Sequence, residues 1–142
     1  MSRPRSAVIA AIAALAMTGA LCTGCSVDTV IWGAEGARVI ALADDVVDQV
    51  IAGAESPRAC PLSSPEFGEP QRWLGLSGGE PERLAGDFWK DQRSLGAVWT
   101  INLEGLDSTT AENGGRYPSY VFFAETDDDL CVIDIEWGTV TF

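Results

Sequence analysis

Three segments in the last third of the chain alternate apolar and polar side chains, and this pattern constrains the fold more than any other feature of the sequence. The segments cover residues 95–104, 120–125 and 131–138. Alternation with a period of two is typical of a β-strand that turns one face to a core and the other to water. Because residues 126–129 suit a tight turn between the last two segments, the sequence predicts an antiparallel meander of about three to four half-buried strands.

Residues 34–52 have the periodicity of a long amphipathic α-helix, with apolar side chains on one side and three aspartates on the other. The apolar set is Val39, Leu42, Ala43, Val46, Val47, Val50 and Ile51, and the acidic set is Asp44, Asp45 and Asp48. Gly53 suits the position that follows a helix, and Pro57 prevents its continuation.

A second, short helix is predicted from Pro81 to about Gln92, because proline is favoured at the first position of a helix. Between the two helices, residues 56–79 contain four of the seven prolines. They predict an ordered, irregular connection that could include a short strand over residues 71–74. One long and one short helix packed on an antiparallel meander make an α+β fold, with residues 34–142 as a single domain.

The start of the chain has the pattern of an export signal. Arg3 and Arg5 precede an uncharged, apolar run over residues 7–21, which is short for a membrane span. Thr23, Gly24 and Cys25 then resemble the lipobox of bacterial lipoproteins, Leu-(Ala/Ser/Thr)-(Gly/Ala)-Cys, although Cys22 stands at the usual leucine position. An uncleaved signal anchor and ordinary secretion after residue 20 are the alternatives.

The resemblance to bacterial lipoproteins implies that residues 1–24 are removed and that Cys25 becomes the lipid-bearing N-terminus. Residues 25–33 then form a short membrane tether. Two or more acyl chains give stable anchoring, so the expected location is the extracytoplasmic face of the cell membrane. The membrane, reached through the lipid on Cys25, is the first predicted partner.

Cys60 and Cys131 are the cysteines that remain once Cys22 leaves with the signal and Cys25 is lipidated. An exported chain with two such cysteines usually pairs them. We therefore expect a Cys60–Cys131 disulfide, with two buried reduced thiols as the alternative.

The charge of the chain narrows the class of partner. Removal of residues 1–24 takes away two of nine basic residues and none of the 21 acidic ones, so the net charge changes from −12 to −14. Such a field disfavours nucleic acid and anionic lipid surfaces. It favours a cationic ligand or an envelope protein as the partner.

The chain contains no histidine, which excludes Ser-His and Cys-His nucleophilic sites and zinc hydrolysis of the HExxH type. No cofactor is predicted. Carboxylates remain as candidate catalytic groups, either in the aspartate pairs of the predicted helix or on one face of the predicted sheet. The expected sheet cluster is Glu104, Glu125, Asp134 and Glu136.

The run Asp127-Asp128-Asp129 is a weak candidate calcium site, because it lacks the spaced ligands and the closing glutamate of an EF-hand loop. A hairpin turn with solvated acids is the alternative, and no other metal site is predicted. Among the tryptophans, Trp73 and Trp89 could line a groove, while Trp99 and Trp137 alternate with core residues.

These features favour a lipid-anchored binding or accessory module at the cell envelope. Its expected working surface is the connection over residues 56–79 together with the polar loop over residues 106–118. A small carboxylate-dependent hydrolase of envelope polymers and a structural or inhibitor-type surface lipoprotein are the alternatives. Catalytic activity is the less favoured of these hypotheses.

Overall fold

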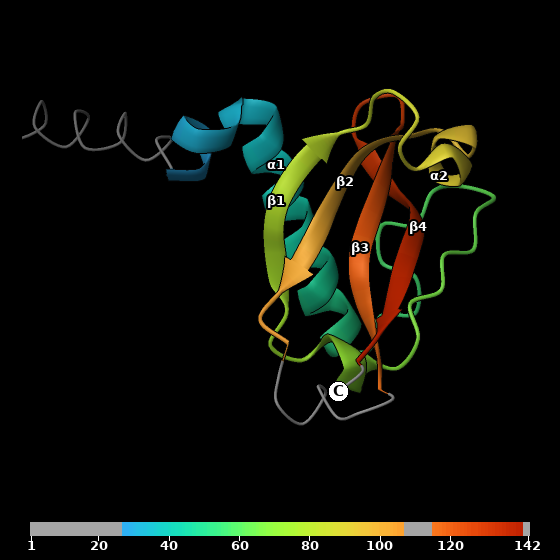
Figure 1. The fold of residues 1–142 in the computed structure, drawn as a ribbon. Coiled ribbons are helices and arrows are strands. Elements are labelled where there is room, and N and C mark those ends of the chain that lie inside the picture. Colours follow the sequence, from blue (N-terminus) through green and yellow to red (C-terminus); the bar gives the residue numbers. More distant parts are fainter. Residues whose placement is uncertain (1–26, 107–114, 141–142) are drawn as a thin grey trace, which may run out of the picture.

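The computed structural model describes residues 27–106 and 115–140, which form one long helix and a four-stranded antiparallel sheet. Predictions about Cys25 and about most of the 106–118 loop lie outside the described residues. The elements in chain order are α1 (Val27–Ile51), the 3₁₀ helix η2 (Pro70–Trp73), β1 (Ser77–Arg83), α2 (Lys90–Ser94), β2 (Ala97–Glu104), β3 (Arg116–Glu125) and β4 (Leu130–Thr139). The sheet order β1-β2-β3-β4 is a meander, so the predicted α+β fold is confirmed (Figure 1).

The core lies between α1 and one face of this sheet. The predicted apolar stripe of α1 is buried apart from its last residue, Ile51, and it packs against inward side chains of all three long strands. The strand side of this core includes Ile101, Val121, Phe123, Val132 and Ile135. Among the described residues, no helix is both long and apolar enough to cross a bilayer.

Two glycines allow α1 to approach β1 closely. A Cβ atom on Gly78 would lie 3.2 Å from the Cβ atom of Ala43 and 3.3 Å from the carbonyl oxygen of Ile40. A Cβ atom on Gly36 would lie 3.3 Å from the Cγ atom of Pro81. Small residues at both crossing points therefore set the distance between the helix and the edge of the sheet.

α1 starts earlier than the sequence predicts and is kinked at Gly33. The backbone at Gly33 has φ 75° and ψ 174°, a conformation that is essentially restricted to glycine. Figure 1 shows the turn before the kink projecting from the body of the domain. Within the expected tether, residues 27–32 are thus helical, and Gly33 forms the kink.

The predicted helix from Pro81 to Gln92 is wrong. Pro81 lies in β1 opposite Ile101, where an edge strand tolerates a residue without an N–H group. A helix starts only at Lys90, after left-handed backbone at Gly86 and Trp89. Residues 71–74 likewise do not form a strand, because Pro70–Trp73 is a 3₁₀ helix.

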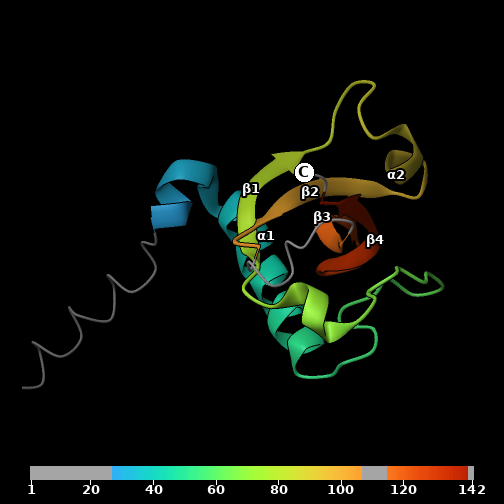
Figure 2. The same cartoon turned by 60° about the horizontal axis from the view of Figure 1, so that its bottom comes forward.

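The central strands are buried on both faces, which corrects the prediction that they are half-buried. Trp89 packs over the second face, with its ring centroid 5.0 Å from that of Phe122 and 5.1 Å from that of Tyr120. Phe122 and Thr100 are consequently almost fully buried. Figure 2 shows α2 on the side of the sheet away from α1.

A β-bulge changes the side-chain pattern of β4. Phe122 pairs with Asp134 whereas Phe123 pairs with Val132, so Ile133 is the additional residue on β4. A bulge of this kind switches which residues face the core. As a result Val132 is fully buried and belongs to the core with Ile135, whereas strict alternation over residues 131–138 would place Ile133 on the same side as Ile135.

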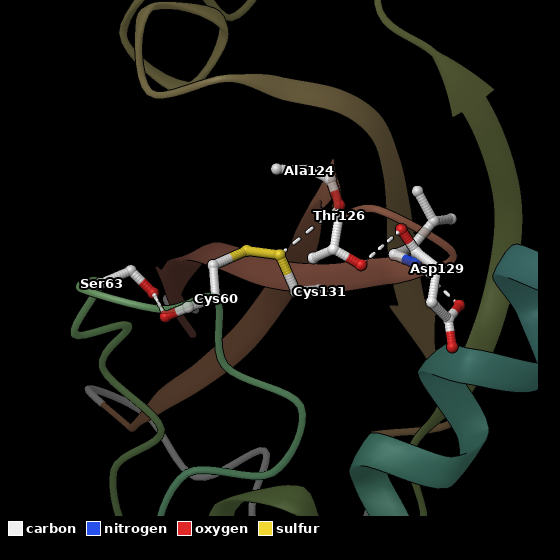
Figure 3. Close-up of a disulfide and its surroundings, with 7 residues drawn as sticks. Cys60, Ser63, Ala124, Thr126, Asp129 and Cys131 are labelled. Atoms are coloured by element: carbon white, nitrogen blue, oxygen red, sulfur yellow. Dashed lines mark hydrogen bonds between the residues drawn. A yellow bond between two sulfur atoms is a disulfide. The ribbon is translucent and has the colours of Figure 1, made fainter.

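The predicted disulfide between Cys60 and Cys131 is confirmed, and it attaches the irregular connection to β4 (Figure 3). Ala59 forms a parallel bridge with Val132. The Cys60 N–H donates to the Val132 carbonyl (2.8 Å), and the Val132 N–H donates to the Arg58 carbonyl (2.7 Å). Residues 58–60 thus extend the sheet beside β4 by a short stretch.

Replacement of both cysteines by alanine should lower the free energy of unfolding by about 4 kcal/mol, because the bond closes a ring across a sequence separation of 71 residues. Urea denaturation of the double variant and of the wild type, the latter with and without reductant, measures this loss. A loss below about 1 kcal/mol in the variant would contradict a major role for the disulfide.

Candidate functional site

An open cavity of about 320 Å³ lies where the β3–β4 turn meets α1 and the β1–β2 edge. We call it the hairpin cleft. Its lining residues are Glu35, Arg38, Arg83, Trp99, Glu125, Thr126, Asp127, Asp128, Asp129 and Leu130. The lining combines one aromatic ring with five carboxylates and two guanidinium groups.

The predicted tight turn forms one wall of the hairpin cleft. The N–H and the hydroxyl group of Thr126 both donate to the carbonyl oxygen of Asp129, at 2.7 and 3.0 Å (Figure 3). The side chain of Asp129 accepts a hydrogen bond from the N–H of Leu130 at 2.7 Å. These bonds hold the turn in one shape and direct Asp129 back toward the body of the domain.

Arginines connect the turn to α1 and to the connection. Asp129 pairs with Arg38 of α1 and lies 3.8 Å from an Nη atom of Arg58. Arg58 in turn donates from Nε to Asp45 at 2.6 Å. The Leu130 N–H, and then Arg38 and Arg58, lower the pKa of Asp129. The hydrogen bond from Arg58 is the main cause that lowers the pKa of Asp45.

The direction in which the pKa values of Asp45 and Asp129 are shifted decides whether these two groups can act as general acids. A general acid at neutral pH needs a carboxyl group whose pKa is raised toward the operating pH. Asp45 and Asp129 are displaced in the opposite direction and therefore stay ionised. Both groups serve as anchors for arginines, which is a structural role.

The candidate calcium run does not come together as a site in the described part of the chain. Asp129 is held by Arg38, which opposes the binding of a divalent cation at the same carboxylate. Among residues 27–106 and 115–140, no three acidic, cysteine or histidine side chains are close enough together to hold a metal ion.

Trp99 contributes the aromatic surface of the hairpin cleft. The guanidinium group of Arg83 lies over its ring, 5.7 Å from the centroid, and pairs with Glu35 at 3.7 Å. Thus one face of this indole already accommodates a cation. From the sequence, Trp99 is predicted to be a packing residue, and neither Arg38 nor Arg83 is identified, because no local pattern links residues so far apart in the chain.

Three carboxylates of the hairpin cleft make no ion pair within the described part of the chain. Glu125, Asp127 and Asp128 are exposed and form no ion pair with any other described residue. They surround the paired groups and leave the cleft with a surplus of negative charge. This arrangement can attract a cation by electrostatics and hold it beside an aromatic face.

The expected carboxylate cluster on one sheet face is not formed. Glu125 lies in the hairpin cleft, whereas Asp134 accepts a hydrogen bond from Gln92 at 3.2 Å under the α2 segment. Glu104 accepts from Asn102 at 3.2 Å. Asp134 pairs with Phe122 and Glu136 with Tyr120, so both acids lie on the sheet face away from α1. Glu104 shares that face but lies on β2, and β3 separates β2 from β4. Glu125 pairs with Leu130 and lies on the opposite face.

The aspartates of α1 also have separate environments. Asp44 accepts the N–H of Gly78 at 2.7 Å and so ties α1 to β1. Asp45 belongs to the arginine network, and Asp48 is exposed. Asp44 and Asp45, two of the three aspartates of α1, therefore each make a contact with another part of the fold.

A second open cavity, of about 400 Å³, lies on the predicted working surface. Glu66 and Arg72 of the connection meet Arg116 and Trp137 there. Arg116 pairs with Glu66 at 3.3 Å and lies 5.1 Å from the ring centroid of Trp137, whose Nε1–H donates to the Glu66 carbonyl at 2.8 Å. Two acidic and two arginine side chains line this cavity, so it lacks the surplus of negative charge of the hairpin cleft, which is the stronger candidate for a cation.

The two tryptophans predicted to line a groove are packing residues instead. Trp73 is fully buried in the core and donates from Nε1 to the Phe67 carbonyl at 2.7 Å. Trp89 covers Phe122. The half-buried Trp99 and Trp137 line the cavities.

No known family, curated protein or solved structure matches this chain.

Acid should destabilise the domain through the arginine network. The Leu130 N–H and the two arginines hold the pKa of Asp129 below its ordinary value in the folded state, so the unfolded state binds more protons as the pH falls. The stability contributed by this carboxylate is present above its unfolded pKa and is lost as the pH falls through the folded pKa. Between about pH 5 and about pH 3, Asp129→Asn should therefore lose stability less steeply than the wild type.

Urea unfolding at a series of pH values measures these slopes. Asp128→Asn is the matched control, because it removes an exposed carboxylate of the same turn that has no basic partner among the described residues. Its slope should follow that of the wild type. Equal slopes for Asp129→Asn and the wild type would contradict the assigned role of the network.

Proposed function

We propose that this protein is a lipid-anchored extracytoplasmic lipoprotein that acts as a small binding or accessory module at the cell envelope, with the hairpin cleft as the site for a cationic ligand. The observation that carries the ligand class is that Glu125, Asp127 and Asp128, which form no ion pair with another described residue, line the same cavity as Trp99. The anchor follows from the lipobox-like residues that end at Cys25.

The position of the domain supports an anchor at Cys25. α1 covers Val27–Ile51, and Cys25 precedes Val27 by two residues in the sequence. No long flexible spacer separates Cys25 from the domain. A module attached in this way stays close to the membrane surface, since a tether of so few residues has little reach.

The composition of the hairpin cleft supports a primary amine or guanidinium group as the ligand. Such groups combine with carboxylates through charge-assisted hydrogen bonds and with an indole through cation–π attraction. Arg83 and Arg38 show both kinds of contact within the same cavity. A volume of about 320 Å³ matches one basic side chain or a small amine better than a large polymer segment.

The anchor predicts a defined mass for the membrane-extracted protein. We expect residues 25–142 plus two or three acyl chains, with a gain of two hydrogens on reduction of the Cys60–Cys131 bond. Intact mass spectrometry before and after reduction measures both. The mass of the unprocessed chain, or cleavage after residue 20, would refute lipidation at Cys25.

The ligand class predicts binding of a basic peptide. Replacing Glu125, Asp127 and Asp128 by their amides should weaken the binding of a fluorescent tetra-arginine peptide by roughly tenfold, because each exposed ion pair contributes ~0.2–1 kcal/mol. Fluorescence anisotropy at fixed ionic strength measures the dissociation constant.

The control for this experiment has the same change in net charge. Amide replacements at Glu55, Glu69 and Asp87 remove three exposed carboxylates outside the hairpin cleft. This variant should bind within about twofold of the wild type, which separates the site from the overall field of the protein. An equal loss in both variants would mean that the peptide senses only net charge.

A further inference from the structure

The helical turn before Gly33 exposes its apolar side to solvent. Val27, Val30 and Ile31 retain 74%, 82% and 62% of their accessible surface, and Trp32 retains 37%. The first three residues follow the i, i+3, i+4 spacing that places side chains on one side of a helix. Thr29, on the other side of the turn, is less exposed than these apolar residues. An apolar helix side that faces outward marks a surface for a partner or a membrane.

The kink makes the turn project as a separate surface. After Gly33, the apolar stripe of α1 faces the sheet and is buried. A straight helix would continue the same stripe toward its N-terminus, but the backbone at Gly33 interrupts it with φ 75°. A Cβ atom on Gly33 would have no neighbouring atom within 4 Å, so the glycine is required by its backbone conformation and not by space.

Trp32 attaches the projecting turn to the domain. A Cβ atom on Gly36 would lie 2.7 Å from the Cβ atom of Trp32, so this glycine leaves the space in which the tryptophan folds back on α1. Part of the indole nevertheless stays exposed. A partly exposed indole next to aliphatic side chains is the composition that favours the boundary between lipid headgroups and acyl chains.

We propose that Val27, Val30, Ile31 and Trp32 form a membrane seat, a surface that lies in the headgroup region of the bilayer to which Cys25 is attached. This inference rests on the proposed lipid anchor. The sequence points to the bilayer as the occupant, because Cys25, the proposed lipidation site, precedes Val27 by two residues. A lipid on Cys25 therefore brings the seat to the bilayer at a high effective concentration.

The net charge of the protein limits how much of its surface can approach the bilayer when the seat lies in the headgroup region. A net charge of −14 after removal of residues 1–24 repels an anionic lipid surface. The projecting turn carries a single acidic residue, Asp28, among its six residues. The attraction of the seat to lipid is thus hydrophobic, while repulsion keeps the remaining surface in water, and the two effects together give the module one orientation.

This orientation determines how far the hairpin cleft lies from the membrane surface. Glu35 and Arg38 line the cleft and follow Trp32 by three and six residues along α1. Even a fully extended chain of six residues spans only about 20 Å, so the cleft lies within that distance of the seat. The seated module would therefore take up its cationic ligand next to the membrane surface.

Quenching of tryptophan fluorescence by brominated lipid tests the seat in the intact protein. The membrane-extracted protein is reconstituted into phosphatidylcholine vesicles with and without bromine on the upper acyl chain, and the emission of Trp32 is obtained as the difference between the wild type and Trp32→Phe. We expect brominated lipid to quench the Trp32 emission. Val30→Asp should remove most of this quenching, because a carboxylate opposes insertion.

Leu62→Asp is the matched control, since Leu62 is a fully exposed leucine on the connection and outside the seat. It should leave the quenching of Trp32 unchanged. Unquenched Trp32 emission in the wild type would overturn the seat and would instead indicate that water, another protein or a second copy covers this surface. The comparison of the wild type with Trp32→Phe tests the seat by itself, so the experiment still gives an answer if an aspartate variant fails to fold.

The mass of the same sample separates this inference from the proposed anchor. An acylated chain whose Trp32 is not quenched refutes the seat and leaves the anchor in place. A chain that is not acylated but shows quenched Trp32 supports the seat and refutes the anchor at Cys25. A chain with neither property refutes both proposals.

Discussion

The close contact between α1 and β1 at Gly78 is the constraint on which the rest of this structure depends. The missing side chain lets the helix backbone at Ile40 and the methyl group of Ala43 approach the strand, and Asp44 accepts the Gly78 N–H at the same point. Packing and a hydrogen bond thus fix both the distance and the register of helix and sheet. Because the helix is fixed along its length, Arg38 reaches Asp129 in the β3–β4 turn, and the hairpin cleft forms between them.

A second set of contacts holds the irregular connection against this frame. The disulfide and the backbone bonds around Val132 attach residues 58–60 to β4. Arg58 then extends from the connection to Asp45 on α1 and toward Asp129 in the turn. A segment rich in proline, without regular structure of its own, thereby acquires a fixed position. The arginines that organise it also pair with Asp45 and Asp129, while Glu125, Asp127 and Asp128 of the cleft keep no ion pair with another described residue.

The sequence predicted the parts of the fold that a short window of residues can encode. The periodicity of residues 34–52 identified the buried side of α1, and alternation identified β2, β3 and β4 together with the turn between the last two. The predictions were wrong where the local preference of a residue conflicts with its contacts in the tertiary structure. Pro81 suggested a helix start, yet the same missing N–H also suits an edge strand. Three consecutive apolar residues, Val121, Phe122 and Phe123, indicate that β3 is buried on both faces. Interpreting β3 as strictly alternating hid this signal.

By itself, the sequence determined the α+β class, the main helix, the antiparallel meander and the pairing of Cys60 with Cys131, because these follow from periodicity and from the small number of cysteines. Tertiary structure alone decided the bulge in β4, the cover that Trp89 provides, the projection of the turn before Gly33 and the composition of the hairpin cleft. The physical reason is that the bulge, the cover by Trp89 and the hairpin cleft depend on residues that are distant in the chain, whereas the projecting turn depends on the backbone conformation at Gly33. Arg38 and Asp129, separated by 91 residues, meet only after the sheet has formed and the helix has packed on it.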